Sequence, residues 1–304
     1  MADTMYIDGV DALSTYGAYP LGYEGLLTWA EFKPIQTTEW DDEDEIDADL
    51  SNPQLDAHQF SLNVAVRDNM LEEFMEFIYS LHSHTFYFPT IELTQKLRVV
   101  GCSDMETSRT LGIVTLTLSE DMPMSGYEYT PPTSSIKQTH LTHKFLIDGK
   151  DITEYGCALL EGSSDSLRAY PDIKEVLQIS ASNQSGIIVD NKAPVRASSR
   201  QVTISLLMRA SSIEEFWRNY NALYYDITRQ DARQLDLVDT LFVEGYYKSM
   251  SVDYFSPPRF KGDKVWLKFS VIFQTTPMSY YSLLVSEEAE LIYSENLQVN
   301  IAVQ

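Results

Sequence analysis

The sequence predicts a mainly β protein of the α+β class, in which two tandem domains are each a β-sandwich or partly open barrel with one packed helix. Three observations lead to this prediction: a long internal repeat, stretches of alternating apolar and polar residues, and one amphipathic segment with a helix start signal in each repeat. Alternation with period two is typical of a strand with one buried face, and a period near 3.6 of a helix with one buried face.

An internal repeat divides the chain. Ile-Asp-Gly-Val-Asp at 7–11 returns as Ile-Asp-Gly-Lys-Asp at 147–151, and Tyr-Gly follows each soon after. The other matches are Arg67 with Arg209, 71–74 with 213–216, and Gly101 with Gly245. The offset drifts from 140 through 142 to 144, as small loop insertions would produce. This period is too long for a solenoid unit, so we expect two copies of a whole domain.

Each copy begins with the same order of expected strands. A short strand (5–7 or 145–147) is turned by Asp-Gly, and a second stretch follows at 30–35 or 175–180. A polar interruption then precedes strict alternation, at 60–66 in the first copy and 202–208 in the second. Two strands around a long polar excursion predict a hairpin whose tip projects from the body.

A helix is expected next in both copies. Asn69 with Glu72, and Ser211 with Glu214, have the spacing of a capping box. The apolar residues behind these caps, which we expect to face the sheet, are Leu71, Phe74, Met75 and Ile78, and Ile213, Phe216, Trp217 and Tyr220.

Strands are expected to close each copy, and a proline ends each series. The expected strands are 86–88, 97–100 and 113–118 before Pro123, and 240–243, 251–254 and 265–271 before Pro277. The predicted division is a first domain at 1–123, a linker at 124–143, a second domain at 144–277 and a C-terminal arm at 278–304. Leu297, Val299, Ile301 and Val303 alternate like a strand that joins either its own sheet or a neighbour's edge.

The composition is that of a folded globular protein. Of the 304 residues 44% are hydrophobic, and no apolar run reaches the roughly 20 residues of a membrane helix, so no membrane insertion is expected. The N-terminus shows neither a basic nor an apolar segment of a signal peptide. Two cysteines at non-equivalent points, Cys102 and Cys157, favour a reducing compartment over a shared disulfide.

The negative charge is concentrated in the first copy. Residues 1–132 hold 24 acidic and 5 basic residues, net −19, out of a total of −23. Such a surface should repel nucleic acid, which argues against tight DNA binding but suits the wall of a channel through which DNA slides. Simple solubility is the alternative explanation of this charge.

No catalytic constellation is visible. His82 and His84 could chelate a metal but lack a third ligand at a suitable spacing, and the acidic run 41–49 lacks the turn glycine and terminal glutamate of a calcium loop. No nucleophile elbow, P-loop or dinucleotide fingerprint is present. We therefore expect neither an enzyme nor a bound metal or cofactor.

The projecting hairpins offer the candidate site. The first carries the acidic run and the second a basic stretch (190–200), at equivalent positions of the two copies. Opposite charges at such tips predict contacts between subunits, although a solvated acidic loop is the alternative. The candidate interface residues are Trp40, Asp41, Asp42, Glu43, Asp44, Glu45, Asp47, Asp49, Lys192, Arg196 and Arg200.

This layout resembles the tail-tube-type domain of tailed phages, above all the ring-forming domain of distal tail (baseplate hub) proteins. The resemblance covers 5–123 and 144–277, and it lies in the Asp-Gly turn, the long-tipped hairpin, the helix and the proline-terminated strands. It implies a virion structural protein, made in the host cytoplasm, whose ring surrounds the DNA channel and joins the tail tube to the tip.

The resemblance also implies partners. They are other copies of this chain, as a trimer with pseudo-six-fold symmetry or a hexamer, and tail-tube and tip or fibre proteins, while DNA passes without specific binding. The second half is a repeat and not a carbohydrate-binding-type domain, which favours a trimeric hub. The alternative function is a tandem β-domain module that binds a protein or glycan without forming a ring.

Overall fold

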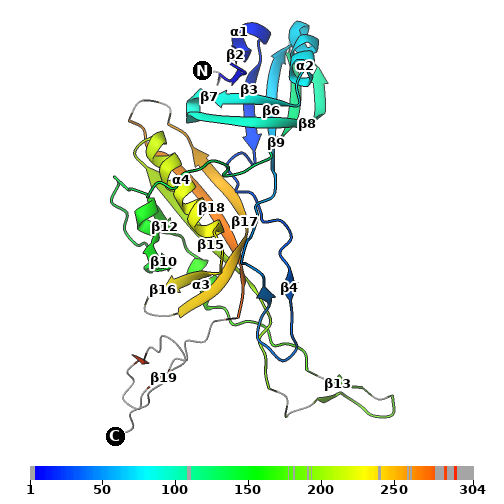
Figure 1. Cartoon of the computed structure of the whole chain (residues 1–304), viewed down its shortest axis with the longest axis vertical. Coiled ribbons are helices and arrows are strands. Elements are labelled where there is room, and N and C mark those ends of the chain that lie inside the picture. Colours follow the sequence, from blue (N-terminus) through cyan, green and yellow to red (C-terminus); the bar gives the residue numbers. More distant parts are fainter. Residues whose placement is uncertain are drawn as a thin grey trace.

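The computed structural model describes residues 4–107, 111–176, 178–180, 182–189, 192, 194–238, 241–258, 260, 262–277, 284–285 and 291–292. It contains two seven-stranded antiparallel sheets, one from each copy, and confirms a mainly β fold (Figure 1). The boundaries of the four proposed segments remain predictions.

The two sheets have the same strand order. Across the first sheet, the strands are β2 (Val10–Asp11), β1 (Tyr6–Ile7), β7 (Ser83–Phe88), β8 (Leu93–Thr107), β9 (Leu111–Glu120), β6 (His58–Arg67) and β3 (Tyr19–Glu24). Across the second, they are β11 (Lys150–Asp151), β10 (Phe145–Ile147), β16 (Arg233–Leu237), β17 (Leu241–Ser256), β18 (Val265–Thr275), β15 (Gln201–Ala210) and β12 (Cys157–Leu159). The internal repeat of the sequence is therefore a repeat of topology.

The repeated Asp-Gly pair forms the same turn in both copies. Asp8 and Asp148 both have φ of 51°, and the glycines after them have φ of 80° and 77°. Two consecutive positive φ angles define the type I′ turn that joins β1 to β2 and β10 to β11, and glycine adopts them without strain. After the turn, Asp11 caps α1 (Ala12–Tyr16) and Asp151 caps a 3₁₀ helix (Ile152–Tyr155).

The helices bury the predicted faces, but both predicted capping boxes are wrong. Helix α4 (Ile213–Thr228) is capped one residue later, where the Ser212 hydroxyl accepts the N–H of Glu215 at 3.1 Å. Helix α2 (Leu71–Tyr79) follows a 3₁₀ turn (Asp68–Met70) and has no side-chain cap. Helix α3 (Ser163–Arg168) is a short addition in the second copy. No helix among the described residues is long and apolar enough to cross a membrane.

Several predicted strands differ from the structure. The partners of β6 and β15 are β3 and β12, which precede the predicted stretches 30–35 and 175–180. The second copy has β16, which the sequence did not reveal, and residues 241–243 and 251–254 of two predicted strands belong to the single strand β17. The strand registers also make Gly101 equivalent to Ser249 and not to Gly245, because α4 has 16 residues and α2 has 9.

Both long hairpins project beyond the second sheet (Figure 1). The first arm (31–56) contains β4 (Thr37–Thr38) and β5 (Asp47–Ala48), and the second arm (172–198) contains β13 (Gln178–Ile179) and β14 (Ile188–Val189). Near the C-terminus, β19 (Leu284–Val285) pairs with β20 (Leu291–Ile292). The predicted alternation at 297–303 lies outside the described residues.

Candidate functional site

The first copy inserts a tryptophan into the second copy. Trp29 precedes the first arm, is 2% exposed, and stacks parallel on Tyr224 with ring centroids 5.1 Å apart. Its ring also lies within 6.0 Å of the rings of Tyr220, Tyr247 and Phe269. Aromatic pairs of this kind add to the free energy gained from burial, so Trp29 anchors the junction of the copies.

Polar groups of the same aromatic residues fix the backbone of the entering segment. The hydroxyls of Tyr220 and Tyr247 donate to the carbonyls of Leu27 and Trp29, at 2.7 and 3.2 Å. The Tyr224 hydroxyl accepts the N–H of Ala30 at 3.0 Å. These buried backbone groups are satisfied by the second copy, so the segment is built to lie against it.

The acidic tip of the first arm ends on the base of the second arm. The N–H of Ala197 donates to the Asp44 carboxylate, and the Ala197 carbonyl accepts the N–H of Glu45, both at 2.7 Å. Lys174 donates to the carbonyls of Trp40 and Glu45, at 2.7 and 2.9 Å. This surface, which we call the arm joint, therefore combines backbone pairing with a cation that caps the tip.

Glu45 is the unusual carboxyl of the arm joint. Burial raises the pKa of Glu45 to about 7, and nearby Asp44 and Glu244 also raise it, whereas Thr275 and Arg200 oppose the rise. The backbone of Glu45 lies in the left-handed region, with φ of 58°. A carboxyl of this pKa changes its charge near neutral pH while its backbone holds the joint.

The other candidate interface residues do not all lie at the arm joint. Asp41, Asp42, Glu43, Asp47, Asp49 and Lys192 are exposed. Arg196 contacts Asp44 at 3.5 Å within the chain, and Arg200 donates to the carbonyls of Ser166 and Leu167, at 2.6 and 2.8 Å. Whether these residues also contact another subunit remains a prediction.

The predicted equivalence of an acidic and a basic tip is wrong. The strand registers match the tip residues 39–46 with 180–187, and they match Arg196 and Arg200 with Gln54 and His58. The two arginines thus lie where the second arm returns to the sheet, which places them within reach of the first arm's tip.

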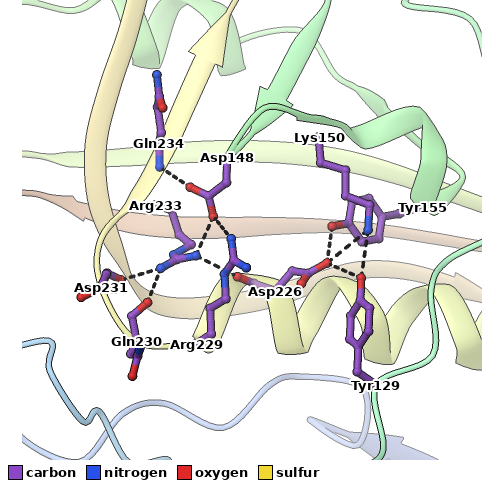
Figure 2. A network of polar contacts seen from close by, with 10 residues as sticks. All are labelled: Tyr129, Asp148, Lys150, Tyr155, Asp226, Arg229, Gln230, Asp231, Arg233 and Gln234. Carbon is purple, nitrogen blue, oxygen red and sulfur yellow. Dashed lines mark hydrogen bonds and ion pairs between the residues drawn. The ribbon is translucent and has the colours of Figure 1, made fainter. Parts of the chain in front are cut away.

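A second cluster of charges lies in the second copy beside a cavity of about 420 Å³ (Figure 2). Asp148 accepts from Arg233 at 2.5 Å and from Arg229 at 2.7 Å, and its other oxygen accepts the N–H of Gln234 at 2.8 Å. Burial lowers the pKa of Arg233, while Asp148 opposes this by stabilising the cation. One carboxylate thus pairs with two guanidinium groups, as in a structural ion-pair network.

The other half of this cluster holds the linker. The Asp226 carboxylate accepts hydrogen bonds from the hydroxyls of Tyr155 and Tyr129, at 2.5 and 2.9 Å (Figure 2). Lys150 lies 3.4 Å from the same carboxylate and 4.5 Å from the centroid of the Tyr155 ring. Burial raises the pKa of Tyr155 and the Asp226 charge raises it further, so its hydroxyl stays a donor and not a nucleophile.

The first copy contains a reduced version of this cluster, and it explains His84. Asp8 accepts from His84 Nδ1 at 2.6 Å and from the N–H of Thr85 at 2.7 Å. The other nitrogen of His84 lies 2.9 Å from the carbonyl of Ile78, at the end of α2. His84 therefore occupies the place of Arg233, whereas His82 is exposed. The described residues contain no group of three or more side chains that could hold a metal ion.

The linker lies along α4 and is held there by hydrogen bonds. Thr133 exchanges two hydrogen bonds with the Asn219 amide, at 2.9 and 3.0 Å. Ser135 donates its N–H and hydroxyl to Glu215, at 2.7 and 2.6 Å. Burial alone would raise the pKa of Glu215, but the hydrogen bonds from Ser135 and Ser211 outweigh it and lower the pKa. The linker is therefore fixed to α4 of the second copy.

A cavity of about 450 Å³ lies between the copies, bounded by the linker, α4 and the end of β9. Glu120, at the end of β9, lines this cavity. Its carboxylate accepts a hydrogen bond from the Gln95 amide at 3.3 Å, and burial raises its pKa. The hydroxyl of Thr28, which also lines this cavity, donates to the carbonyl of Gly25 at 2.6 Å and lies 3.3 Å from His58 Nε2.

Sequence reasoning missed Trp29, Lys174 and Ala197. One signal was available for the lysine, because Glu31-Phe32-Lys33 and Asp172-Ile173-Lys174 repeat at an offset of 141. No comparable signal marks Trp29, because the second copy has α3 in the corresponding part of the chain.

In comparisons with known proteins, similarity is found among solved structures. No model of a known protein family matches the sequence, and no curated protein sequence matches it. Among solved structures, the SPP1 Dit (gp 19.1) protein, described as a paradigm of the hub adsorption apparatus in phages infecting Gram-positive bacteria, is 12% identical. The match covers 90% of this chain and 98% of that chain with a TM-score of 0.31, a likeness too small to carry an argument about function.

Proposed function

We propose that this chain is a structural component of a phage or phage-derived tail or baseplate. In this proposal, several chains form a ring around the DNA channel and join the tail tube to the tip. The partners are further copies of the chain, as a trimer with pseudo-six-fold symmetry or a hexamer, together with tail-tube and tip or fibre proteins. Its place is the virion tail.

The observation that carries the proposal is the arm joint. Two copies of one sheet are held together by an arm that leaves the first, buries Trp29 in the second and ends on the backbone of Ala197. Copies that connect through such arms are suited to building an assembly by repetition. The net charge of −19 in residues 1–132 supports a ring whose wall does not bind phosphates.

The aromatic residues at the junction weaken the alternative of a glycan-binding module. Trp29, Tyr220, Tyr224 and Tyr247 are all buried between the copies, so their faces are not available to stack on a sugar. They serve the connection of the copies instead.

Negative-stain electron microscopy of the purified protein, at high concentration and low salt, tests the proposal. Rings with a pore wide enough for duplex DNA are the expected result, and their symmetry distinguishes three chains from six. Two-lobed monomers alone, even after tail-tube proteins are added, would rule out ring formation.

A further inference from the structure

The two arms are the same structural element. In the first arm the N–H of Lys33 donates to the carbonyl of Gln54 at 2.8 Å, and in the second the N–H of Lys174 donates to the carbonyl of Arg196 at 2.8 Å. The strand pairs β4–β5 and β13–β14 enclose tips of equal length, 39–46 and 180–187. Glu45 and Gly186, which lie 141 residues apart at the same position of the two tips, both have a positive φ, of 58° and 93°.

Each arm base presents the same outward-facing groups. Phe32 pairs with Leu55 in one isolated bridge, and Ile173 pairs with Ala197 in the other. In both bridges the flanking residues make the hydrogen bonds, so the N–H and carbonyl of Leu55 and Ala197 point away from the arm. Each base also carries a lysine at the same position, Lys33 or Lys174.

Only one of these two bases is used within the chain. Ala197 and Lys174 receive the first arm's tip, as described above. Among the described residues, neither the backbone of Leu55 nor the exposed ammonium of Lys33 has a hydrogen-bond partner. The base of the first arm therefore has the same groups that bind a tip in the second arm, and no described residue of the chain contacts them through a hydrogen bond.

Only one of the two arms is covered within the chain. Phe32 packs against Tyr247 of the second copy with ring centroids 5.8 Å apart, whereas its equivalent Ile173 is 66% exposed. The tip region of the second arm exposes Ile179, Ile187 and Ile188 by 56%, 58% and 51%. An exposed apolar hairpin is typical of a segment that docks on a partner.

We propose that the second arm docks on the first copy of a second chain of this protein and forms the same arm joint there. In that joint, the N–H of Gly186 donates to the carbonyl of Leu55, and the Ser185 hydroxyl accepts the N–H of Leu55. Lys33 donates to the carbonyl of Gly186, as Lys174 does to that of Glu45. The inference deepens the proposed function and rests on its self-assembly.

The charges differ between the arm joint within the chain and the proposed joint between chains. Within the chain, Asp44 of the acidic tip meets Arg196. The equivalent residues of the joint between chains are Ser185 and Gln54, and the described residues 182–187 of the second tip carry no charge. In this pairing the acidic tip meets the base with two cations, Lys174 and Arg196, and the neutral tip meets the base with one, Lys33.

Cysteine cross-linking tests the joint. Chains with Ser185→Cys are mixed with chains that carry Leu55→Cys, oxidised gently, and separated without reductant. A covalent dimer that forms in the mixture, and not in either variant alone, is the expected result. The matched control, Asp44→Cys with Ala197→Cys in one chain, should give an intrachain disulfide at the equivalent place.

The outcomes separate this inference from the proposed function. Rings without the cross-link would overturn the joint and leave the ring intact. The cross-link in open chains that never close would support the joint and overturn the ring. Monomers without the cross-link would overturn both.

A lysine pair gives a second measurement that does not depend on cysteine geometry. Lys33→Ala should weaken self-association about tenfold or more in sedimentation, because the tip carbonyls lose a charged donor. Lys96→Ala, at another exposed lysine of the first copy, should leave it unchanged. Equal behaviour of the two variants would overturn the proposed role of Lys33.

Discussion

Replacing Trp29 with alanine should test the junction of the copies most directly. The side chain is 2% exposed and lies against four aromatic rings. Burial of a tryptophan side chain at about 25 cal/mol per Å² is worth about 4 to 6 kcal/mol as an upper bound, and measured tryptophan-to-alanine losses are about 3 to 5 kcal/mol. We therefore expect Trp29→Ala to lower the free energy of unfolding by about 4 kcal/mol.

Urea denaturation followed by circular dichroism measures this loss, and hydrogen exchange locates it. Exchange should accelerate in residues 26–32 and α4, which lose a common packing partner, and much less in β1 and β7. Trp40 provides a matched control, because it is 52% exposed at the tip of the first arm. Trp40→Ala should change the free energy of unfolding by less than about 0.5 kcal/mol.

The reasoning would be refuted if Trp29→Ala cost less than about 1 kcal/mol, because such a loss is typical of a half-exposed residue and not of a core aromatic. Equal effects of the two tryptophan substitutions would refute it as well. Faster exchange throughout the first sheet would show that Trp29 supports its own copy and not the junction.

Three further predictions concern charged groups. The pKa of Glu45 is about 7 in the folded protein and 4.5 as the unperturbed value, so its contribution to stability is complete below pH 4.5 and is lost as the pH rises through 7. Glu45→Gln should remove this dependence and, since the group is partly exposed, stabilise the protein by only about 1 kcal/mol at pH 8.5 and not at pH 4, as thermal unfolding would show. Asp148→Ala leaves buried Arg233 without its carboxylate and should cost about 3 to 5 kcal/mol in urea denaturation. Glu215→Ala should release the linker and accelerate trypsin cleavage after exposed Lys137 about tenfold.

Two of these variants have a control that differs in burial. Asp253→Ala removes an exposed ion pair with Lys268 and should cost less than about 1 kcal/mol, so a cost like that of Asp148→Ala would contradict the network. Glu214 is 81% exposed beside Glu215, and Glu214→Ala should leave cleavage of the linker unchanged. An unaltered pH profile in Glu45→Gln would show that another group titrates.

The sequence predicted what local patterns encode. The Asp-Gly turns, the alternating strands β6 and β15, and the apolar faces of α2 and α4 each follow from residues within a few positions of one another. The duplication was visible for the same reason, because both copies need the same turn and the same helix. The capping box of α4 failed since adjacent serines, Ser211 and Ser212, offer two registers that sequence alone does not separate, and that of α2 failed because a 3₁₀ turn precedes the helix.

The candidate site was predicted only in part, because its contacts join residues far apart in the chain. Asp44 and Glu45 were among the candidates, but their partners Lys174 and Ala197 lie about 130 to 150 residues later and carry no local signal of pairing. The error about Arg196 and Arg200 arose from counting along the chain, whereas hydrogen-bond registers show that these residues match Gln54 and His58. Trp29 has no equivalent that a comparison of the copies could reveal.

The arrangement of the two arms decides what kind of assembly the chain can form. The arm joint is heterologous, because a tip on one copy meets a base on the next, so it has no two-fold symmetry and does not stop at a dimer. A joint of this kind closes into a ring when its rotation divides a full turn, and otherwise continues as a helical filament. The joint within the chain already sets one rotation, and the matching tip lengths and backbone registers of the arms would give the proposed joint between chains the same one. Three chains then close a ring only if that shared rotation is about one sixth of a turn. The symmetry of the particles therefore measures the geometry of a joint that each single chain already contains.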